Sequence, residues 1–380
     1  KKGKLFAILM ILAMLATLIA GCGGSSISPS TPQPKPVLPM CGADISFLPQ
    51  LESLGADFTE NGTVAPLLDI LKNNGVNWIR LRLWVNPSDG WCSLDKTVSL
   101  AKRVKSAGFS FLLDIHYSDS WADPTQQTTP TSWQSLTRTE LVTRVHDYSR
   151  TAVQAFVDAG AAPDMVQVGN EITGGMLWPN GKTEFSWNFS SPVLYGSWDT
   201  NWETGISMVL IGDNTWQAAV PAGDVEFKVV ENNTWWGDNG KDLTLDTTDG
   251  ASANISLSSA AADRVILVND STKVYSYTST AQVNPWDSLS AFLDAGITGV
   301  KAAAPSARIM LHIDCGDDNA SCRSWFDKAA AYNLQYDVIG LSYYSVWRGK
   351  DLSKVSSNLS DLASRYSKDV CIVETSYPWT

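Results

Sequence analysis

Two glutamates follow directly on short apolar stretches, where a charged side chain is out of place as packing. Residues 164–170 read as a buried strand that ends at Asn170 and Glu171, and residues 369–374 read as a strand that ends at Glu374. Catalytic groups in a barrel of parallel strands sit at the carboxyl ends of those strands. Glu171 and Glu374 are therefore the first candidates for chemistry.

A pair of carboxyl groups among aromatic side chains suits the hydrolysis of a glycosidic bond. One carboxylic acid protonates the leaving oxygen, and the other group, as a carboxylate, attacks the anomeric carbon. The attacking carboxylate must stay ionised, so a nearby arginine should lower its pKa. The proton donor needs a pKa that is raised by burial or by the second carboxylate.

Other polar and aromatic residues gather at the same ends of the predicted strands. Within residues 77–83 two arginines alternate with apolar residues, so Arg80 and Arg82 should face the inside of the sheet, where they need carboxylate partners. His116 and His312 are expected to form hydrogen bonds in the pocket rather than to transfer protons, and no spacing typical of a metal site is present. The candidates for substrate binding are Arg80, Arg82, Trp84, Asp114, His116, Asp119, Trp121, Asn170, Trp178, His312, Tyr343, Tyr344 and Trp347.

Strands and helices alternate along most of the chain, which predicts an α/β fold with a parallel sheet covered by helices. The strands are predicted at residues 41–45, 77–83, 109–115, 164–170, 307–313, 336–342 and 369–374. The helices are predicted at residues 65–74, 94–107, 137–159, 286–304, 323–332 and 352–366. Eight such repeats would close a TIM (β/α)8 barrel. Because the sequence stops after the seventh strand, either the sheet is open or the barrel is truncated before its eighth strand, and we favour truncation.

A long segment interrupts this alternation between the two parts of the predicted barrel, residues 40–182 and 286–380. Residues 183–285 are rich in Trp, Thr, Asn, Gly and Asp, with short runs that read as strands at 207–211, 215–220, 225–230, 253–257 and 264–267. This pattern predicts an inserted antiparallel β-sandwich, because the segment is too long for a loop. Four tryptophans are candidates for a sugar-binding platform, although some of them could instead fill the core of the sandwich: Trp198, Trp202, Trp235 and Trp236.

The N-terminal 22 residues have the pattern of a signal peptide, with three lysines before an apolar run. The ending at Gly21 and Cys22 resembles the site at which bacterial lipoproteins receive lipid; the alternative is an ordinary signal peptide with an incidental cysteine. Residues 23–39 are rich in Pro, Ser and Gly and read as a tether. We therefore expect export and a lipid anchor on Cys22, on the periplasmic or surface side of a bacterial envelope.

Cysteine usage and overall charge limit the class of partner. Export would place the remaining cysteines in an oxidising setting, where Cys315 and Cys322 could pair, whereas the pairing of Cys41, Cys92 and Cys371 stays open. The net charge of −11 argues against nucleic acid as a partner. The 16 tryptophans suit a protein that stacks indole rings on sugars. We expect a monomer with a polysaccharide substrate and no cofactor.

The strand-end motifs together resemble glycoside hydrolase family 53, the endo-β-1,4-galactanases. The resemblance covers residues 41–182 and 286–380. It rests on residues 42–46 (GADIS), 80–90 (RLRLWVNPSDG), 114–124 (DIHYSDSWADP), 169–179 (GNEITGGMLWP), 340–344 (GLSYY) and 373–375 (VET).

This resemblance implies a TIM barrel of the retaining clan. Glu171 would be the acid/base, Asn170 would bind the sugar 2-hydroxyl, and Glu374 would be the nucleophile, with either Arg80 or Arg82 beside it. Retention implies that the two carboxyl groups lie about 5–5.5 Å apart. The sequence departs from the family in lacking its last strand, with the Trp-Glu-Pro stretch and the calcium-binding loop that some bacterial members carry there. It also departs in its insertion, which resembles immunoglobulin-like glycan-associated modules.

The resulting hypothesis is an exported, lipid-anchored endo-β-1,4-galactanase that acts on type I arabinogalactan. One alternative is a retaining endo-glycanase for another β-linked polysaccharide. A second is a surface glycan-binding lipoprotein without catalytic activity, which the presence of both glutamates disfavours.

Overall fold

The structure is a computed structural model that describes residues 39–185, 188–239, 241–247, 253–260, 263–279 and 284–376. The predicted signal peptide, Cys22 and nearly all of the predicted tether lie outside these residues. Among the described helices, none has both the length and the apolar character needed to cross a membrane.

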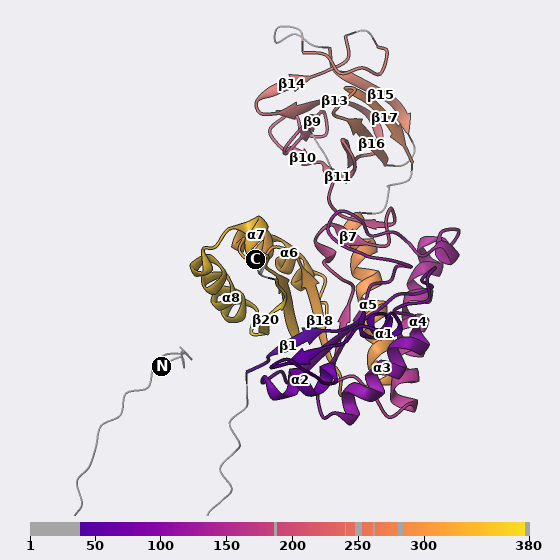
Figure 1. The fold of residues 1–380 in the computed structure, drawn as a ribbon. Coiled ribbons are helices and arrows are strands. Elements are labelled where there is room, and N and C mark those ends of the chain that lie inside the picture. The colour runs from indigo at the N-terminus through magenta and orange to yellow at the C-terminus, as the bar shows by residue number, and fades with distance from the viewer. Residues whose placement is uncertain are drawn as a thin grey trace, which may run out of the picture. The chain divides into compact units, whose positions relative to one another are not determined.

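Helices pack against a parallel sheet of seven strands (Figure 1). Its order is β1-β4-β5-β6-β18-β19-β20, and every neighbouring pair is parallel. All four residues of β6 are buried, as expected for a strand with apolar packing on both faces. The strand bounds are β1 Gly42–Asp44, β4 Trp78–Leu83, β5 Ser110–Ile115, β6 Met165–Val168, β18 Arg308–Ile313, β19 Val338–Ser342 and β20 Asp369–Glu374.

Helices connect successive strands and pack on the outside of the sheet. The long helix α4 begins with a capping box, in which the side chains of Thr137 and Glu140 satisfy each other's backbone N–H groups. The apolar faces of the helices meet the sheet in one large core, where Phe156 of α4 packs against Phe111 of β5. The connecting helices are α2 Leu67–Asn73, α3 Leu94–Ser106, α4 Arg138–Asp158, α5 Pro285–Ala303, α6 Asn319–Ala331 and α8 Leu352–Tyr366.

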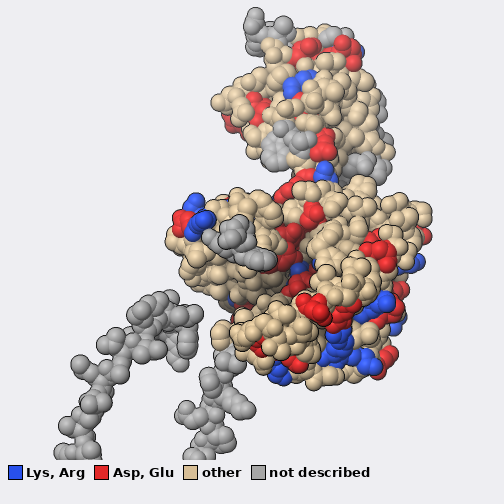
Figure 2. Space-filling view, viewed as in Figure 1, with Lys and Arg blue, Asp and Glu red and all other residues tan. Residues whose placement is uncertain are grey.

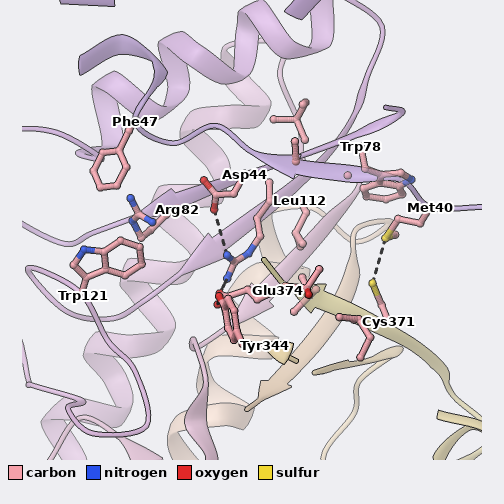
Figure 3. A pocket seen from close by; sticks show the side chains of 17 residues that line it. Met40, Asp44, Phe47, Trp78, Arg82, Leu112, Trp121, Tyr344, Cys371 and Glu374 are labelled. Atoms are coloured by element: carbon pink, nitrogen blue, oxygen red, sulfur yellow. Dashed lines mark hydrogen bonds and ion pairs between the residues drawn. The ribbon is translucent and has the colours of Figure 1, made fainter. Parts of the chain in front are cut away.

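The parallel sheet is curled, so that its first and last strands approach each other. Asp44 at the end of β1 and Glu374 at the end of β20 both contact the guanidinium of Arg80 in β4, at 3.2 and 2.7 Å. Two carboxylates from opposite ends of the strand order can reach one side chain only if the sheet bends around it. Before the carboxyl ends of the same two strands, the sulfur atoms of Met40, which precedes β1, and Cys371 of β20 lie 3.6 Å apart (Figure 3).

The seven predicted parallel strands and the six predicted helices are all present, within a few residues of their predicted ends. The largest difference is at α6, which begins at Asn319 because the side chain of Asp318 caps it. Several short elements are additional to the prediction. They are α1 Leu48–Ser53, α7 Ser345–Arg348, the 3-10 helices Thr131–Trp133 and Ile172–Gly174, and the short strands β2 Thr59–Glu60, β3 Thr63–Val64, β7 Gly175–Met176 and β8 Gly181–Lys182.

The described residues between 193 and 278 form two antiparallel sheets. One contains β9 Val193–Gly196, β10 Ile206–Ser207, β13 Gly223–Glu231, β14 Thr234–Trp236 and β15 Ile255–Ala260, and the other contains β11 Val209–Gly212, β12 Thr215–Val220, β16 Arg264–Asn269 and β17 Val274–Thr278. Both sheets contribute side chains to one apolar cluster, for example Phe227 of β13 and Ile266 of β16. The single strand predicted at 207–211 is wrong: the chain passes at Met208 from one sheet to the other, so these residues belong to two strands.

Candidate active site

A cavity of about 440 Å³ lies inside the curl of the parallel sheet and reaches the carboxyl ends of the strands. Its lining includes Arg80, Arg82, Trp121, Tyr344 and Glu374, most of which are labelled in Figure 3. In Figure 2, Asp and Glu side chains line a recess in the part of the molecule that contains this sheet. The sequence placed its candidates at this end of the sheet, and the structure brings most of them together there.

Glu374 is held as an ionised carboxylate. Its Oε1 lies 2.7 Å from Nη2 of Arg80, and its Oε2 accepts a hydrogen bond of 2.9 Å from the hydroxyl of Tyr344. Burial by itself would raise the pKa of Glu374, but the charge of Arg80 and the Tyr344 hydroxyl lower the pKa below its usual value. An ionised carboxylate at this position can act as a nucleophile.

Arg80 is the centre of the charge network, and it resolves the choice that the sequence left open between Arg80 and Arg82. Its guanidinium contacts Asp44, Glu374 and, at 2.8 Å, the buried carboxylate of Asp114. It also donates a hydrogen bond of 2.7 Å to the side-chain oxygen of Asn170. Burial opposes its charge, but the surrounding carboxylates raise its pKa above the usual value. A permanent positive charge therefore faces Glu374.

Asp114, His116 and Gln167 form a buried layer beneath Arg80. Nε2 of His116 donates to Asp114 at 2.9 Å, because its Nδ1 is occupied as the acceptor from the backbone N–H of Ala122. Gln167 donates to the other oxygen of Asp114 at 2.6 Å. Burial would raise the pKa of Asp114, but Arg80 and His116 lower it to about 2. His116 thus has the hydrogen-bonding role that the sequence suggested.

Glu171 has the opposite electrostatic environment from Glu374. It is 8% exposed, and burial, followed by the charges of Glu374 and Asp314, raises its pKa to about 8. At neutral pH it is therefore mainly a carboxylic acid, which is the form of a proton donor. The two carboxyl groups differ in pKa because one faces the guanidinium of Arg80 and the other is buried near two acidic side chains.

The backbone around Glu171 is strained in a way that turns its side chain out of the strand. Glu171 has φ 45° and ψ 51°, in the left-handed region that few non-glycine residues adopt. Gly169 has φ 87°, and a Cβ atom there would lie 2.6 Å from a methyl group of Ile172. The side chain of Gln127 donates to the carbonyl oxygens of Asn170 and Glu171, at 2.7 and 3.3 Å, and holds this turn.

His312 and Asn170 connect Glu171 to the rest of the layer. Nδ1 of His312 lies 3.0 Å from the side-chain oxygen of Asn170, and its Nε2 lies 2.8 Å from the hydroxyl of Ser342. Burial lowers the pKa of His312 to about 4, so the ring is neutral near pH 7. The amide nitrogen of Asn170 donates to the carbonyl of Ala122 at 2.8 Å.

Arg82 has a different environment from the one that the sequence predicted. We expected carboxylate partners, but within the described part of the chain it forms no ion pair. Its guanidinium instead lies 4.5, 4.9 and 3.8 Å from the ring centres of Phe47, Trp84 and Trp121. Figure 3 shows Arg82 between Phe47 and Trp121. The electron-rich faces of the rings stabilise the buried charge, which replaces a carboxylate. Trp121 is 44% exposed and remains accessible from the cavity.

The remaining candidates divide into residues near the cavity and residues that hold loops. Tyr344 lines the cavity, and its ring packs against that of Trp347, which is 77% exposed. Asp119 accepts hydrogen bonds from the backbones of Asn86 and Thr131, and Tyr343 is buried and donates to the carbonyl of Gly349. The indole N–H of Trp178 donates to the carbonyl of Gly174. Asp119, Tyr343 and Trp178 therefore have positions that suit loop structure.

The four tryptophans predicted as one sugar platform lie in different environments. Trp198 and Trp236 pack against the apolar cluster of the two antiparallel sheets. Trp235, the neighbour of Trp236 on β14, is 40% exposed, and its ring centre lies 5.5 Å from that of Tyr195. Trp202 is half-buried in a turn. Because neighbouring residues on a strand point to opposite faces, Trp235 and Trp236 do not share a surface.

Sequence reasoning missed four residues that build the site. Asp44 and Phe47 lie in or beside the first predicted strand, and Ser342 ends the sixth. Gln167 was detectable, because it is a polar residue in the middle of an otherwise apolar strand. Among the described residues, no group of three or more His, Cys, Asp or Glu side chains is arranged to hold a metal ion. The sulfur atoms of Cys315 and Cys322 are in contact at 3.5 Å as thiols.

The raised pKa of Glu171 predicts a pH-dependent effect on stability. Its pKa of about 8 in the folded protein exceeds the unfolded value of roughly 4.3. The stability that neutral Glu171 contributes is therefore fully present below about pH 4.3 and is lost as the pH rises through about 8. Glu171→Gln, which stays neutral, should raise Tm relative to the unmodified protein, and the difference should grow between pH 5 and pH 9.

Glu140→Gln is a control that should change Tm in the opposite direction. Hydrogen bonds from Thr137 lower the pKa of Glu140, so its ionised form favours folding and its removal should lower Tm in the same pH range. Differential scanning calorimetry across this range measures both variants. A constant Tm difference for Glu171→Gln between pH 5 and pH 9 would contradict the assignment of the raised pKa.

The chain is similar to known glycoside hydrolases. The model of glycosyl hydrolase family 53 matches residues 40–217 and 238–380. The probable arabinogalactan endo-β-1,4-galactanase A of Aspergillus fumigatus is 32% identical over 344 residues, which cover 89% of this chain and 69% of the fungal protein.

Two solved structures also resemble the chain. The GH53 catalytic domain of Ignisphaera aggregans has a TM-score of 0.61 and 27% identity, over 92% of this chain and 72% of the other. A structure from work on two fungal β-1,4-galactanases has the same TM-score and identity, over 90% and 75% of the two chains. With a family model that matches most of its length, the chain belongs to glycosyl hydrolase family 53.

Proposed function

We propose that this glycoside hydrolase is an endo-acting, retaining β-1,4-galactanase that cleaves the galactan of type I arabinogalactan. The observation that carries the proposal is a pair of glutamates at the carboxyl ends of β6 and β20 of one curled sheet, one of which lies against the guanidinium of Arg80 while the other is buried. Glu374 is ionised beside Arg80, whereas Glu171 is buried and protonated. The choice of galactan is supported by the names of relatives that are 32% and 27% identical to this chain.

The two glutamates would act in two steps. First, the Glu374 carboxylate attacks the anomeric carbon, the bond to the leaving oxygen breaks, and that oxygen takes the proton of Glu171. Then Glu171 takes a proton from water, the water oxygen attacks the anomeric carbon, and Glu374 leaves as a carboxylate. Arg80 and Tyr344 keep Glu374 ionised between turnovers. A separation of about 5–5.5 Å between the two carboxyl groups is required for this route and stays a prediction.

Substrate binding would use the aromatic and amide groups at the mouth of the cavity. Trp121 offers an exposed ring face to a sugar, and Arg82 holds that ring from its other side. Asn170 has one amide N–H bonded to Ala122, and the other would donate to the sugar 2-hydroxyl. Trp347 and Tyr344 would form a further aromatic surface.

Release of reducing ends from β-1,4-galactan tests the proposed function directly. The full-length protein should release them from galactan in preference to other β-linked glycans, such as β-1,4-mannan and β-1,4-xylan. Release from another β-glycan alone would favour the first alternative, a retaining endo-glycanase with a different substrate. Binding of galactan without any release would favour the non-catalytic glycan-binding alternative.

We also propose that residues 183–285 are an inserted immunoglobulin-like β-sandwich module that binds glycan, between barrel parts at 40–182 and 286–380. The two antiparallel sheets and their common apolar cluster support this interpretation. The exposed Trp235, with the half-buried Tyr195 beside it, replaces the four-tryptophan platform as the proposed sugar surface. The seven-stranded sheet would belong to a (β/α)8 barrel, which its curl supports.

The module proposal predicts a specific loss of polymer binding. Trp235→Ala should weaken binding to galactan about threefold to tenfold, because it removes a stacking surface worth roughly 0.5–1.5 kcal/mol. Hydrolysis of short oligosaccharides should not change. Tyr277→Ala, which removes an exposed aromatic residue from the other sheet, is the matched control. Equal polymer affinity of the Trp235→Ala variant and the unmodified protein, in affinity electrophoresis, would argue for a structural insert.

For location, we propose export and lipid attachment at Cys22. The pattern of residues 1–22 and the tether at 23–39 support this proposal. Cys22→Ser should move the protein from the membrane fraction to the soluble exported fraction and abolish incorporation of labelled palmitate. Unchanged fractionation and labelling would contradict the anchor.

A further inference from the structure

A second cavity, of about 360 Å³, lies at the carboxyl ends of β6, β18 and β19. Thr173, two residues after Glu171, lines it together with Asp314, which follows β18. The hydroxyl of Thr173 donates to Asp314 at 2.5 Å, and the other oxygen of Asp314 lies 2.6 Å from Arg348. Asp314 also contributes to the raised pKa of Glu171. The second cavity is therefore built directly onto the segment that carries the proton donor.

The first and second cavities differ in whether Glu374 lines them. Glu374 and Arg80 line the first cavity and do not line the second. In a displacement at the anomeric carbon, the proton donor lies beside the leaving oxygen, and the nucleophile lies on the opposite face of the sugar ring. The leaving-group part of a polymer therefore extends from the side of the proton donor. Glu171 itself lines neither cavity, but Thr173, two residues after it, lines the second cavity together with Asp314.

The second cavity is lined by both acidic and basic side chains. Glu184 and Lys328 line it, and neither forms an ion pair with another residue in the described part of the chain. Burial raises the pKa of Glu184 and lowers that of Lys328, which means that water is partly excluded from both. The amino group of Lys328 lies 5.2 Å from the ring centre of Trp286, which also lines the cavity.

A neutral sugar fits this combination better than a charged group does. Hydroxyl groups can both accept from an ammonium and donate to a carboxylate, and the apolar face of a sugar suits an indole. A cavity of this size is at the small end for ligand sites, which is compatible with one or two sugar rings. A net negative ligand would meet Glu184 and Asp314, and a positive one would meet Lys328 and Arg348.

We propose that this cavity is a subsite that binds a neutral sugar residue of the leaving-group portion of the polymer, with Lys328 donating to a sugar hydroxyl and Glu184 accepting from another. The proposal rests on the proposed glycosidase function and adds a substrate contact to the same site. It assigns Glu184 and Lys328 to substrate binding and leaves the chemical step to Glu171 and Glu374.

Two substrates that differ in their leaving group distinguish sugar binding in this subsite from the chemical step. The first is galactan, and the second is an aryl β-1,4-galactobioside, whose phenol leaving group ends close to the cleavage point. In the full-length protein, the Lys328→Met, Glu184→Gln double variant should lose about tenfold in kcat/KM on galactan through a higher KM. On the aryl substrate its kcat/KM should equal that of the unmodified protein. Lys102→Met on the outer helix α3 is the control for loss of a surface lysine, and it should change neither value.

The outcomes distinguish the subsite from the function on which it rests. Unchanged kinetics of the double variant on galactan would overturn the subsite alone, as would an equal loss on both substrates, because that pattern indicates general damage. Absence of any release from galactan by the unmodified protein would overturn the proposed function, and the subsite with it.

Discussion

Replacing Glu374 with alanine is expected to reduce kcat on galactan by a factor on the order of 10⁴ or more, as the loss of a covalent nucleophile does. Added azide should restore part of the rate. In the unmodified protein Glu374 lies 2.7 Å from Arg80 and accepts from Tyr344, so its removal leaves a small cationic space in which an azide anion is favoured. Azide would then attack the anomeric carbon from that side and give a galactosyl azide of inverted configuration. Proton NMR of the product measures the configuration directly.

Glu171→Ala is the comparison that distinguishes the nucleophile from the proton donor. Loss of the proton donor should slow the cleavage of galactan, whose leaving oxygen needs a proton, far more than that of an aryl galactoside with a good leaving group. Azide should rescue this variant too, but only in the second step, and the product should keep the original configuration. An inverted azide product from Glu171→Ala, together with a retained one from Glu374→Ala, would reverse the two roles.

The second large effect is expected from Arg80→Met, which should destabilise the fold as well as abolish activity. Arg80 is 7% exposed and contacts the carboxylates of Asp44, Asp114 and Glu374. Its removal leaves the buried Asp114 and the half-buried Glu374 without their counter-charge, and breaking a buried ion pair typically costs about 3–5 kcal/mol. Urea denaturation at pH 7 should show this loss in the free energy of unfolding. The loss should shrink as the pH falls, because protonation of the abandoned carboxylates removes the repulsion between them.

Arg103→Met provides a matched control on the surface. Arg103 forms a two-point ion pair with Glu52, with contacts of 2.8 and 2.7 Å, but both side chains are largely exposed. An exposed pair is worth about 0–1 kcal/mol because water and salt screen it. Comparable losses in the two variants at pH 7 would mean that the network around Arg80 does not carry the expected charge interactions.

Much of the architecture could be predicted because it depends on local patterns. The seven parallel strands are short apolar runs bounded by Gly, Asp and Asn, and the helices have amphipathic spacing and recognisable caps such as Thr137 with Glu140. A charged side chain within a parallel strand that is buried on both faces needs partners from other strands, as Arg80 does, whereas a charge at a strand end is readily recognised as a candidate for chemistry. For that reason Glu171 and Glu374 were visible as candidates before any contact was known.

The antiparallel segment was harder to predict for a physical reason. Strands such as β9, β14 and β17 are short and half exposed, so their residues carry little alternation of apolar and polar character. Their pairing depends on distant partners: Tyr195 of β9 pairs with Lys228 of β13. The environments of the tryptophans depend on the same distant contacts, because only packing distinguishes Trp236, which packs against the apolar cluster, from the exposed Trp235.

The sequence by itself determined the parallel-sheet class, the two strand-end glutamates and the need for an arginine beside one of them. Only the tertiary structure decided that Arg80 serves Glu374 while Arg82 lies among three aromatic rings. Both arginines alternate with apolar residues on β4, so the local sequence does not distinguish which of them lies beside Glu374. They differ because the curl of the sheet brings Asp44 from its first strand and Glu374 from its last to Arg80. Charge partners that are far apart in the sequence are brought together by the curl of the sheet, which no local pattern records.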